Sequence, residues 1–193
     1  ELFGKKYGYE TAVSNLMVSH LNEKKKRFIK DKYVRKKSKI LDIGCNDGTF
    51  LNLFKNSYEL FGIDPSAIKF KKNYNKNIKL ITDYFSKKNL LAKIDKKTKF
   101  DLITSFAVFY DIDDPNKFCN DINKLLKDNG VWVCELSYLP LMLKNLTFDQ
   151  ICHEHLTYYT VNVFEKIINK SGLRILDLSL NEINGGSIEI IVC

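Results

Sequence analysis

The feature that most constrains the fold of this chain is a regular alternation of short apolar segments and helical segments between residues 39 and 136. The apolar segments predict strands at 39–43, 58–63, 78–82, 100–104 and 131–136. The segments between them predict helices at 48–55, 66–73, 86–94 and 115–127, after an earlier helix at 11–30. A turn at Asp128-Asn129-Gly130 leads into the last of these strands. Strands that alternate with helices form a mostly parallel sheet covered on both faces.

The last third of the chain departs from this alternation. An irregular stretch is expected at 137–159, followed by a helix at 161–171. Two further apolar stretches, 173–180 and 187–192, predict strands. The link between them contains Asn184-Gly185-Gly186 and is so short that the two strands must be antiparallel neighbours. The predicted fold class is therefore α/β, a mostly parallel seven-stranded sheet with a C-terminal antiparallel hairpin and helices on both faces.

Length and composition are those of one globular domain. The 193 residues are 45% hydrophobic and 28% charged, and they suffice for a sizeable core, so we expect one domain over residues 1–193. Because the chain begins at Glu1 rather than methionine, we expect it to be a fragment. Its apolar runs are too short for a bilayer and no signal segment opens it, which favours a cytoplasmic protein without a membrane partner. The five cysteines are widely spaced and form no C-x-x-C pair, which argues against a disulfide framework or a zinc module.

The net charge of +8 leaves two interpretations open. Lysine runs such as 24–27 and 35–39 are compatible with nucleic-acid binding or with solvated faces of a lysine-rich protein. No basic stripe interleaved with aromatic residues accompanies these runs, so we favour solvated faces and no nucleic-acid partner. A positive domain does suit an anionic substrate such as a nucleotide sugar.

The first predicted strand leads into a glycine-containing loop. Cofactor contacts are predicted there for Asp42, Gly44, Cys45, Asn46, Asp47 and Gly48. Glycine lets the backbone turn tightly and approach a ligand where a Cβ atom would collide. A dehydrogenase would carry G-x-G-x-x-G to cradle a pyrophosphate, whereas the spacing here is Gly44-x-x-x-Gly48. S-adenosylmethionine carries an ammonium and a sulfonium but no phosphate, so acids near the loop favour it over a dinucleotide.

Further cofactor contacts are predicted where the next three strands end. Asp64, followed by Pro65, lies where a ribose is held, and its two oxygens can accept from both hydroxyls. Asp83 can accept from an adenine amino group with Tyr84 packed on the ring, or it can simply cap the next helix. Ser105 and Phe106 are expected to line the pocket because ligands lie outside the carboxyl ends of strands.

Several segments resemble a known family. Leu41–Gly48 with Gly62–Ser66 resembles class I S-adenosylmethionine-dependent methyltransferases of Rossmann-like fold. The segments 109–111, 152–159, 184–187 and 7–9 resemble a narrower group, the C-methyltransferases of nucleotide-linked deoxy-ketosugars. The resemblance spans essentially the whole chain. It implies S-adenosyl-L-methionine as cofactor, a nucleotide sugar as substrate, and flanking zinc-binding and C-terminal domains that this chain lacks.

Methylation of carbon requires a base whose pKa lies near neutrality. This base removes a proton from the carbon beside a ketone, and the resulting enolate attacks the methyl group. The resemblance places this base in His153-Glu154-His155. We assign it to His155, with Glu154 and His153 positioning substrate or steadying the enolate. If the segment is extended, the two histidines point to one side and Glu154 to the other.

Tyr9 and Tyr110 are candidate hydrogen-bond donors in the sugar pocket, whereas Cys152 stands where relatives often have tyrosine. Other interpretations stay open. Cys152 with the two neighbouring histidines has the chemistry of zinc ligands, although H-E-H lacks the i, i+4 spacing of a helical zinc motif. The histidines could also be structural. An O- or N-methyltransferase, a sugar oxidoreductase and a non-catalytic binding module are the rival functions.

Overall fold

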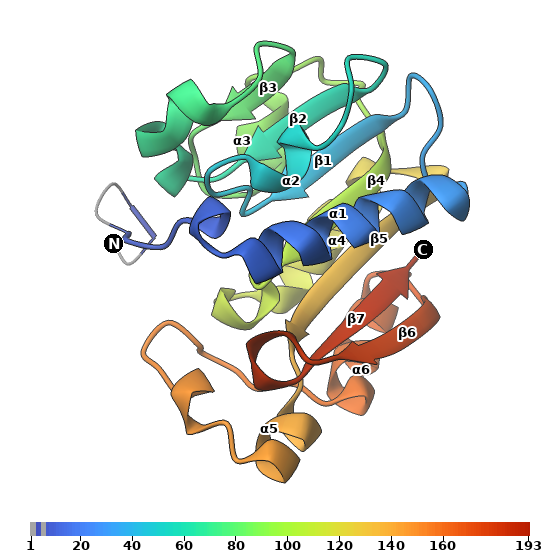
Figure 1. Cartoon of the computed structure of the whole chain (residues 1–193). Coiled ribbons are helices and arrows are strands. Elements are labelled where there is room, and N and C mark those ends of the chain that lie inside the picture. The colour runs from blue at the N-terminus through green and yellow to red at the C-terminus, as the bar shows by residue number, and fades with distance from the viewer. Residues whose placement is uncertain (1–2, 5–6) are drawn as a thin grey trace.

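Seven strands form one sheet in the order β3-β2-β1-β4-β5-β7-β6 (Figure 1). The computed structural model describes residues 3–4 and 7–193, so residues 1–2 and 5–6 of the expected domain at 1–193 lie outside the described residues. The strands are β1 (Lys39–Ile43), β2 (Glu59–Ile63), β3 (Ile78–Ile81), β4 (Phe100–Phe106), β5 (Leu126–Ser137), β6 (Ile175–Asn181) and β7 (Ser187–Val192). β1 to β5 are parallel, and β7 runs antiparallel between β5 and β6. The predicted fold class is confirmed.

Helices cover both faces of this sheet. The α-helices are α1 (Asn15–Lys30), α2 (Thr49–Asn52), α3 (Lys87–Leu91), α4 (Pro115–Leu125), α5 (Leu139–Asn145) and α6 (Val161–Lys170). Short 3-10 helices are η1 (Thr11–Val13), η2 (Ser66–Asn73), η3 (Phe109–Asp111), η4 (Phe148–Gln150) and η5 (Ile183–Gly185). α1 crosses one face of the sheet, and α4 and α6 lie on the other (Figure 1). No helix in the described part of the chain is both long and apolar enough to span a bilayer.

The helices begin where the sequence supplies capping side chains. Asp114 accepts from the backbone N–H of Lys117 at 2.9 Å, and Pro115 occupies the first turn of α4. Ser14 accepts from the N–H of Met17 at the start of α1. Each cap satisfies a donor that the first turn of a helix leaves unpaired, so these starts are fixed locally.

Two expectations for individual elements are wrong. The stretch at 137–159 is not wholly irregular, because it contains α5 and η4. The Leu139–Leu143 run at the start of α5 is apolar apart from its proline and therefore shows no helical periodicity. The turn expected at 128–130 lies inside β5, which begins at Leu126 and absorbs a register shift opposite Phe100 and Leu102. The helix predicted at 66–73 is present with the same bounds and is of the 3-10 type.

Candidate functional site

A cavity of about 890 Å³ opens at the carboxyl ends of the parallel strands. Its floor is formed by residues that follow β1 and β2 and by residues at the ends of β4 and β5. The segment at 7–11, before α1, forms one wall, and the segment at 149–156 forms another. This is the edge at which open α/β sheets bind ligands.

The cavity brings together twelve of the seventeen residues predicted from sequence. They are Tyr9, Asp42, Gly44, Cys45, Asn46, Asp64, Pro65, Tyr84, Phe106, Tyr110, Glu154 and His155. The other five, Asp47, Gly48, Asp83, Ser105 and His153, do not line it. Residues from six separate segments of the chain therefore converge, as a shared ligand site requires.

Three of the residues outside the cavity wall have structural contacts instead. Ser105 is fully buried and accepts from the indole N–H of Trp132 at 2.9 Å. Asp47 accepts from the N–H and hydroxyl of Thr49, and so fixes the start of α2. Asp83 accepts from the N–H of the next residue. These contacts match the local roles that such side chains commonly have at strand and helix ends.

Asp64 ties the ends of β1 and β2 together. Its Oδ2 accepts from the N–H of Asn46 at 2.8 Å, and its Oδ1 accepts from the N–H and hydroxyl of Ser66 at 2.6 and 2.7 Å. A carboxylate oxygen can accept two hydrogen bonds, so Oδ2 can accept one more in addition to that from Asn46. Because Asp64 also lines the cavity, this further hydrogen bond can come from a ligand hydroxyl.

The segment before α1 is fastened to the glycine loop. The N–H of Thr11 donates to Oδ1 of Asn46 at 3.1 Å, and Nδ2 of Asn46 donates to the carbonyl of Tyr9 at 3.0 Å. The N–H of Ala12 donates to Asp47 at 2.7 Å. These contacts hold Tyr9 at the cavity wall, although it is 35 or more residues from the loop in sequence.

Asp42 is buried at the end of β1. It is 3% exposed, and burial raises the pKa of its carboxyl to about 7, although a 2.7 Å hydrogen bond from the Thr104 hydroxyl opposes this. Near neutral pH this group is therefore divided between its acid and carboxylate forms. It is a weaker source of negative charge than the sequence suggested.

Gly44 illustrates why the loop needs glycine. Its φ is +72°, and a Cβ atom there would lie 2.4 Å from Cγ2 of Val108. The space is filled by a side chain of the protein itself, so the requirement is one of packing as well as of backbone conformation. The sequence had attributed it to the ligand's approach.

We therefore expect Gly44→Ala to destabilise the fold by about 1–3 kcal/mol, from left-handed backbone strain and overpacking. Urea unfolding measures this. Adding Val108→Ala removes the clash but not the strain, so the double variant is expected to recover part of the loss. No recovery would show that the Val108 contact is unimportant.

His155 lies at the opposite wall with one ring nitrogen already occupied. Its Nδ1 is 2.7 Å from the backbone carbonyl of Gln150, which can only accept, so Nδ1 carries a proton. In the neutral ring Nε2 is then the acceptor nitrogen. The ring also packs on Tyr110, with centroids 4.0 Å apart. The chain thus sets both the tautomer and the position of this imidazole.

The H-E-H segment is a turn rather than an extended strand, which corrects the expected arrangement. The N–H of His155 donates to the carbonyl of Cys152 at 3.3 Å, closing the turn. Glu154 and His155 consequently line the same cavity, while His153 is exposed. Backbone hydrogen bonding and the Cys152 thiol hold the pKa of Glu154 below its usual range, so it is a carboxylate.

Asp111 is a site residue that the sequence reasoning did not assign. It lines the cavity, its Oδ1 is buried without a hydrogen-bond partner among the described residues, and burial with the nearby Glu154 charge raises its pKa to about 8. At neutral pH it is largely protonated and can donate a hydrogen bond. Asp111 is the last residue of the segment 109–111, which carried part of the family resemblance. That resemblance was the signal in the sequence that could have identified Asp111 as a site residue.

The raised pKa of Asp111 predicts a pH dependence of stability. Its ordinary pKa of 3.8 applies to the unfolded chain and about 8 to the folded one, so the folded state binds more protons between these values. Stability is expected to fall as pH rises from about 4 to about 8. Asp111→Asn should make this fall smaller but not abolish it, since Asp42 contributes in the same direction. Urea midpoints at pH 5 and 8.5 test this, and an unchanged difference would contradict it.

Among residues 3–4 and 7–193, no group of three or more His, Cys, Asp or Glu side chains is arranged to hold a metal ion. The zinc interpretation of Cys152, His153 and His155 therefore has no convergent ligand set in this part of the chain.

Comparisons with known proteins match this chain to methyltransferases. A family model described as a methyltransferase domain matches residues 17–178. A ubiquinone biosynthesis O-methyltransferase of Pelagibacter ubique is 30% identical over 183 residues, covering 86% of this chain and 75% of that protein. The C-methyltransferase NovU of Streptomyces niveus is 26% identical over 152 residues, covering 78% of this chain. This chain spans 36% of NovU's length.

Solved structures share the fold at low sequence identity. An S-adenosylmethionine-dependent methyltransferase from Clostridium acetobutylicum is 15% identical with a TM-score of 0.64, covering 91% of each chain. Magnesium protoporphyrin IX methyltransferase from Synechocystis, solved with S-adenosylhomocysteine bound, is 14% identical with a TM-score of 0.66. It covers 96% of this chain and 90% of its own.

Proposed function

This chain belongs to the methyltransferase domain family, and we propose that it transfers a methyl group from S-adenosylmethionine to carbon of a nucleotide-linked keto-deoxysugar. The observation that carries the choice of carbon is His155, a base whose tautomer is fixed by Gln150 and which faces the cavity. Transfer to a carbon needs such a base, because a proton must leave the carbon beside the ketone.

The residues around the glycine loop fit the cofactor. Asp64 keeps an acceptor position for a ribose hydroxyl, and Asn46, Gly44, Phe106 and Tyr84 complete that side of the cavity. When bound, S-adenosylmethionine supplies a methyl group made electrophilic by a sulfonium. At the carboxyl ends of the parallel strands, the methyl donor therefore lies on the β1–β2 side of the cavity, and the β4–β5 side is left for the acceptor.

The acceptor side contains groups suited to enolate formation. Nε2 of neutral His155 takes the proton from the carbon beside the ketone. Asp111, protonated at neutral pH, and the hydroxyl of Tyr110 donate hydrogen bonds to the oxygen on which charge develops. Glu154, as a carboxylate, favours the imidazolium that forms.

The charge of the cavity restricts how a nucleotide sugar is held. Lys117 is the one Lys or Arg among the described lining residues, against nine acidic ones: Asp42, Asp64, Asp111, Asp113, Asp114, Asp121, Glu135, Asp149 and Glu154. Even with Asp111 protonated and Asp42 partly protonated, the remaining carboxylates would repel phosphates there, so the sugar ring occupies the cavity and the diphosphate lies outside it. The positive net charge of +8 therefore comes from residues that do not line the cavity.

An O-methyltransferase is the second candidate, favoured by the 30% identity to the Pelagibacter ubique protein. Methylation of a hydroxyl oxygen does not need a base that removes a proton from carbon, although the His155 imidazole, with its fixed tautomer, could also deprotonate a hydroxyl.

Incubation with labelled S-adenosylmethionine and a panel of nucleotide ketosugars tests the proposal. Carbon-bound label in the product, located by NMR, is the expected result. Exchange of the proton beside the ketone with deuterium from the solvent, in the presence of S-adenosylhomocysteine, tests His155 chemistry separately. Label on oxygen, or only on acceptors other than sugars, would overturn carbon methylation.

A further inference from the structure

Glu135 is a buried acid at the carboxyl end of β5 that the proposed reaction does not use. It is 4% exposed, its side chain lies on the α1 face of the sheet, and it lines the cavity. It is the acidic member of the otherwise apolar run Val131–Leu136. An ionised group in such a place needs partners, because burial without them is costly.

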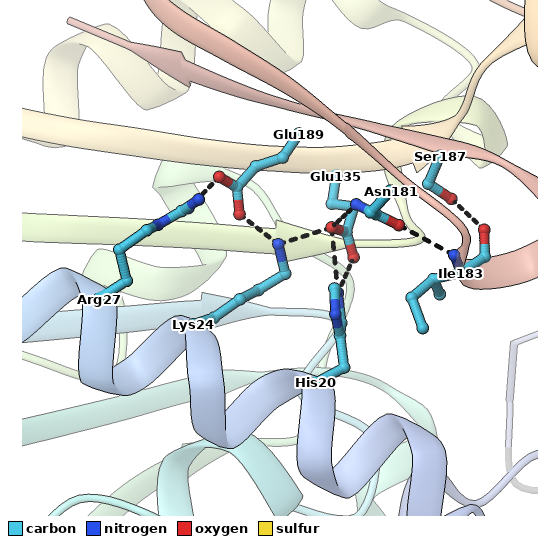
Figure 2. Close-up of polar contacts among 8 residues, drawn as sticks. All are labelled: His20, Lys24, Arg27, Glu135, Asn181, Ile183, Ser187 and Glu189. Atoms are coloured by element: carbon cyan, nitrogen blue, oxygen red, sulfur yellow. Dashed lines mark hydrogen bonds and ion pairs between the residues drawn. The ribbon is translucent and has the colours of Figure 1, made fainter.

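Helix α1 supplies two of these partners (Figure 2). Nε2 of His20 is 2.8 Å from Oε1 of Glu135, and Nζ of Lys24 is 2.6 Å from Oε2. Lys24 also pairs with Glu189 of β7, which pairs with Arg27 one turn further along the helix. The His20 hydrogen bond and the Lys24 charge lower the pKa of Glu135 despite its burial, so it is a carboxylate.

The last residue of β6 supplies a third partner, which also contacts the link to β7. Nδ2 of Asn181 donates to Oε2 of Glu135 at 2.8 Å, and Oδ1 of Asn181 accepts from the N–H of Ile183 at 3.0 Å. The hydroxyl of Ser187 donates to the carbonyl of Ile183 at 2.8 Å, completing the chain drawn in Figure 2. Ile183 and Ser187 line the cavity together with Asn184.

Glu135 thus connects two separate parts of the molecule, through partners that do not themselves line the cavity. Through His20 and Lys24 it fixes α1. The segment that precedes α1 is in turn attached to the glycine loop, since the N–H of Thr11 donates to Asn46. Through Asn181 it fixes the η5 wall on the acceptor side. Stability alone does not call for this arrangement, since replacing buried ion pairs by apolar residues is often neutral or stabilising.

We propose that Glu135 is a positioning residue that holds helix α1 and the η5 segment in register on opposite sides of the cavity. The purpose of that register, ordering donor and acceptor for methyl transfer, rests on the proposed function. His20 does not line the cavity, so it acts by holding Glu135 and α1 rather than as a second base.

The test compares Glu135→Gln with Lys127→Gln in the full chain. Gln keeps the shape of Glu135 but removes its charge, and Lys127 pairs with Asp101 at 2.8 Å away from the cavity. For Glu135→Gln we expect about tenfold weaker binding of S-adenosylhomocysteine by calorimetry, which corresponds to ~1.4 kcal/mol. We also expect faster amide hydrogen exchange at both 9–12 and 183–187, and no change in either readout for Lys127→Gln.

A second pair of variants, at His20, keeps the proposal testable if Glu135→Gln does not fold. His20→Gln can still donate to Glu135, whereas His20→Leu cannot, so only the leucine variant is expected to weaken binding and loosen residues 9–12. Unchanged exchange at either segment in Glu135→Gln, or equal effects in the two His20 variants, would overturn the proposal. Failure of the unmodified chain to bind S-adenosylhomocysteine would refute the proposed function instead, and the exchange results would still decide the role of Glu135.

Discussion

Replacing His155 by alanine is expected to lower the rate of methyl transfer by about 10²–10⁴-fold, the usual contribution of a positioned acid–base group. The imidazole is held by the carbonyl of Gln150 and by the ring of Tyr110, so its loss removes the acceptor nitrogen and leaves no nearby group in the same position. Binding of S-adenosylhomocysteine should be unchanged, because His155 lies on the side of the cavity that we propose for the acceptor. Single-turnover rates with a saturating ketosugar, together with calorimetry, measure the two effects.

His153→Ala is the matched control for this variant. It removes the same side chain two residues away from a position that is exposed and does not line the cavity. We expect its rate to stay within about threefold of the unmodified chain, as for most surface substitutions. Equal losses in the two variants would show that the whole turn matters rather than the base, and full turnover by His155→Ala would remove the base assignment.

Replacing Asp64 by asparagine is expected to weaken S-adenosylhomocysteine binding by about 10- to 100-fold. Hydrogen bonds to a charged group are worth ~1.5–3 kcal/mol, and the change removes the charge while the side chain keeps its shape. It also weakens the hold of Asp64 on the N–H groups of Asn46 and Ser66, so the loop after β1 loses part of its order. Calorimetry measures the affinity, and circular dichroism establishes that the variant is folded.

Asp83→Asn makes the same chemical change at the end of the neighbouring strand. Asp83 does not line the cavity and accepts from the N–H of Tyr84, so we expect affinity within about twofold. A loss at Asp83 as large as that at Asp64 would restore the adenine contact predicted from sequence and contradict the arrangement seen here.

The sequence was sufficient for the parts of the molecule that depend on local pattern. Strand bounds at 39–43 and 187–192 match the structure because the first strand is a continuous buried run and the second follows a glycine turn. The approach of Asp64 to the glycine loop was also predictable, since adjacent parallel strands bring their carboxyl ends together. Where the pattern was ambiguous, as in Leu139–Leu143, the element was missed.

What only the tertiary structure decided was which side chains share a space. Besides burial, the charge of Glu154 raises the pKa of Asp111, and it does so only because the segment that follows the turn at 152–155 folds back onto η3, which no spacing indicates. His20 and Glu135 are 115 residues apart, and their pairing depends on how α1 crosses the sheet. Sequence alone thus determined the sheet, its loops and the edge of the sheet at which a ligand site lies, because these follow from local periodicity. The charge states of Asp111 and Glu154 follow from long-range packing, which local periodicity does not encode.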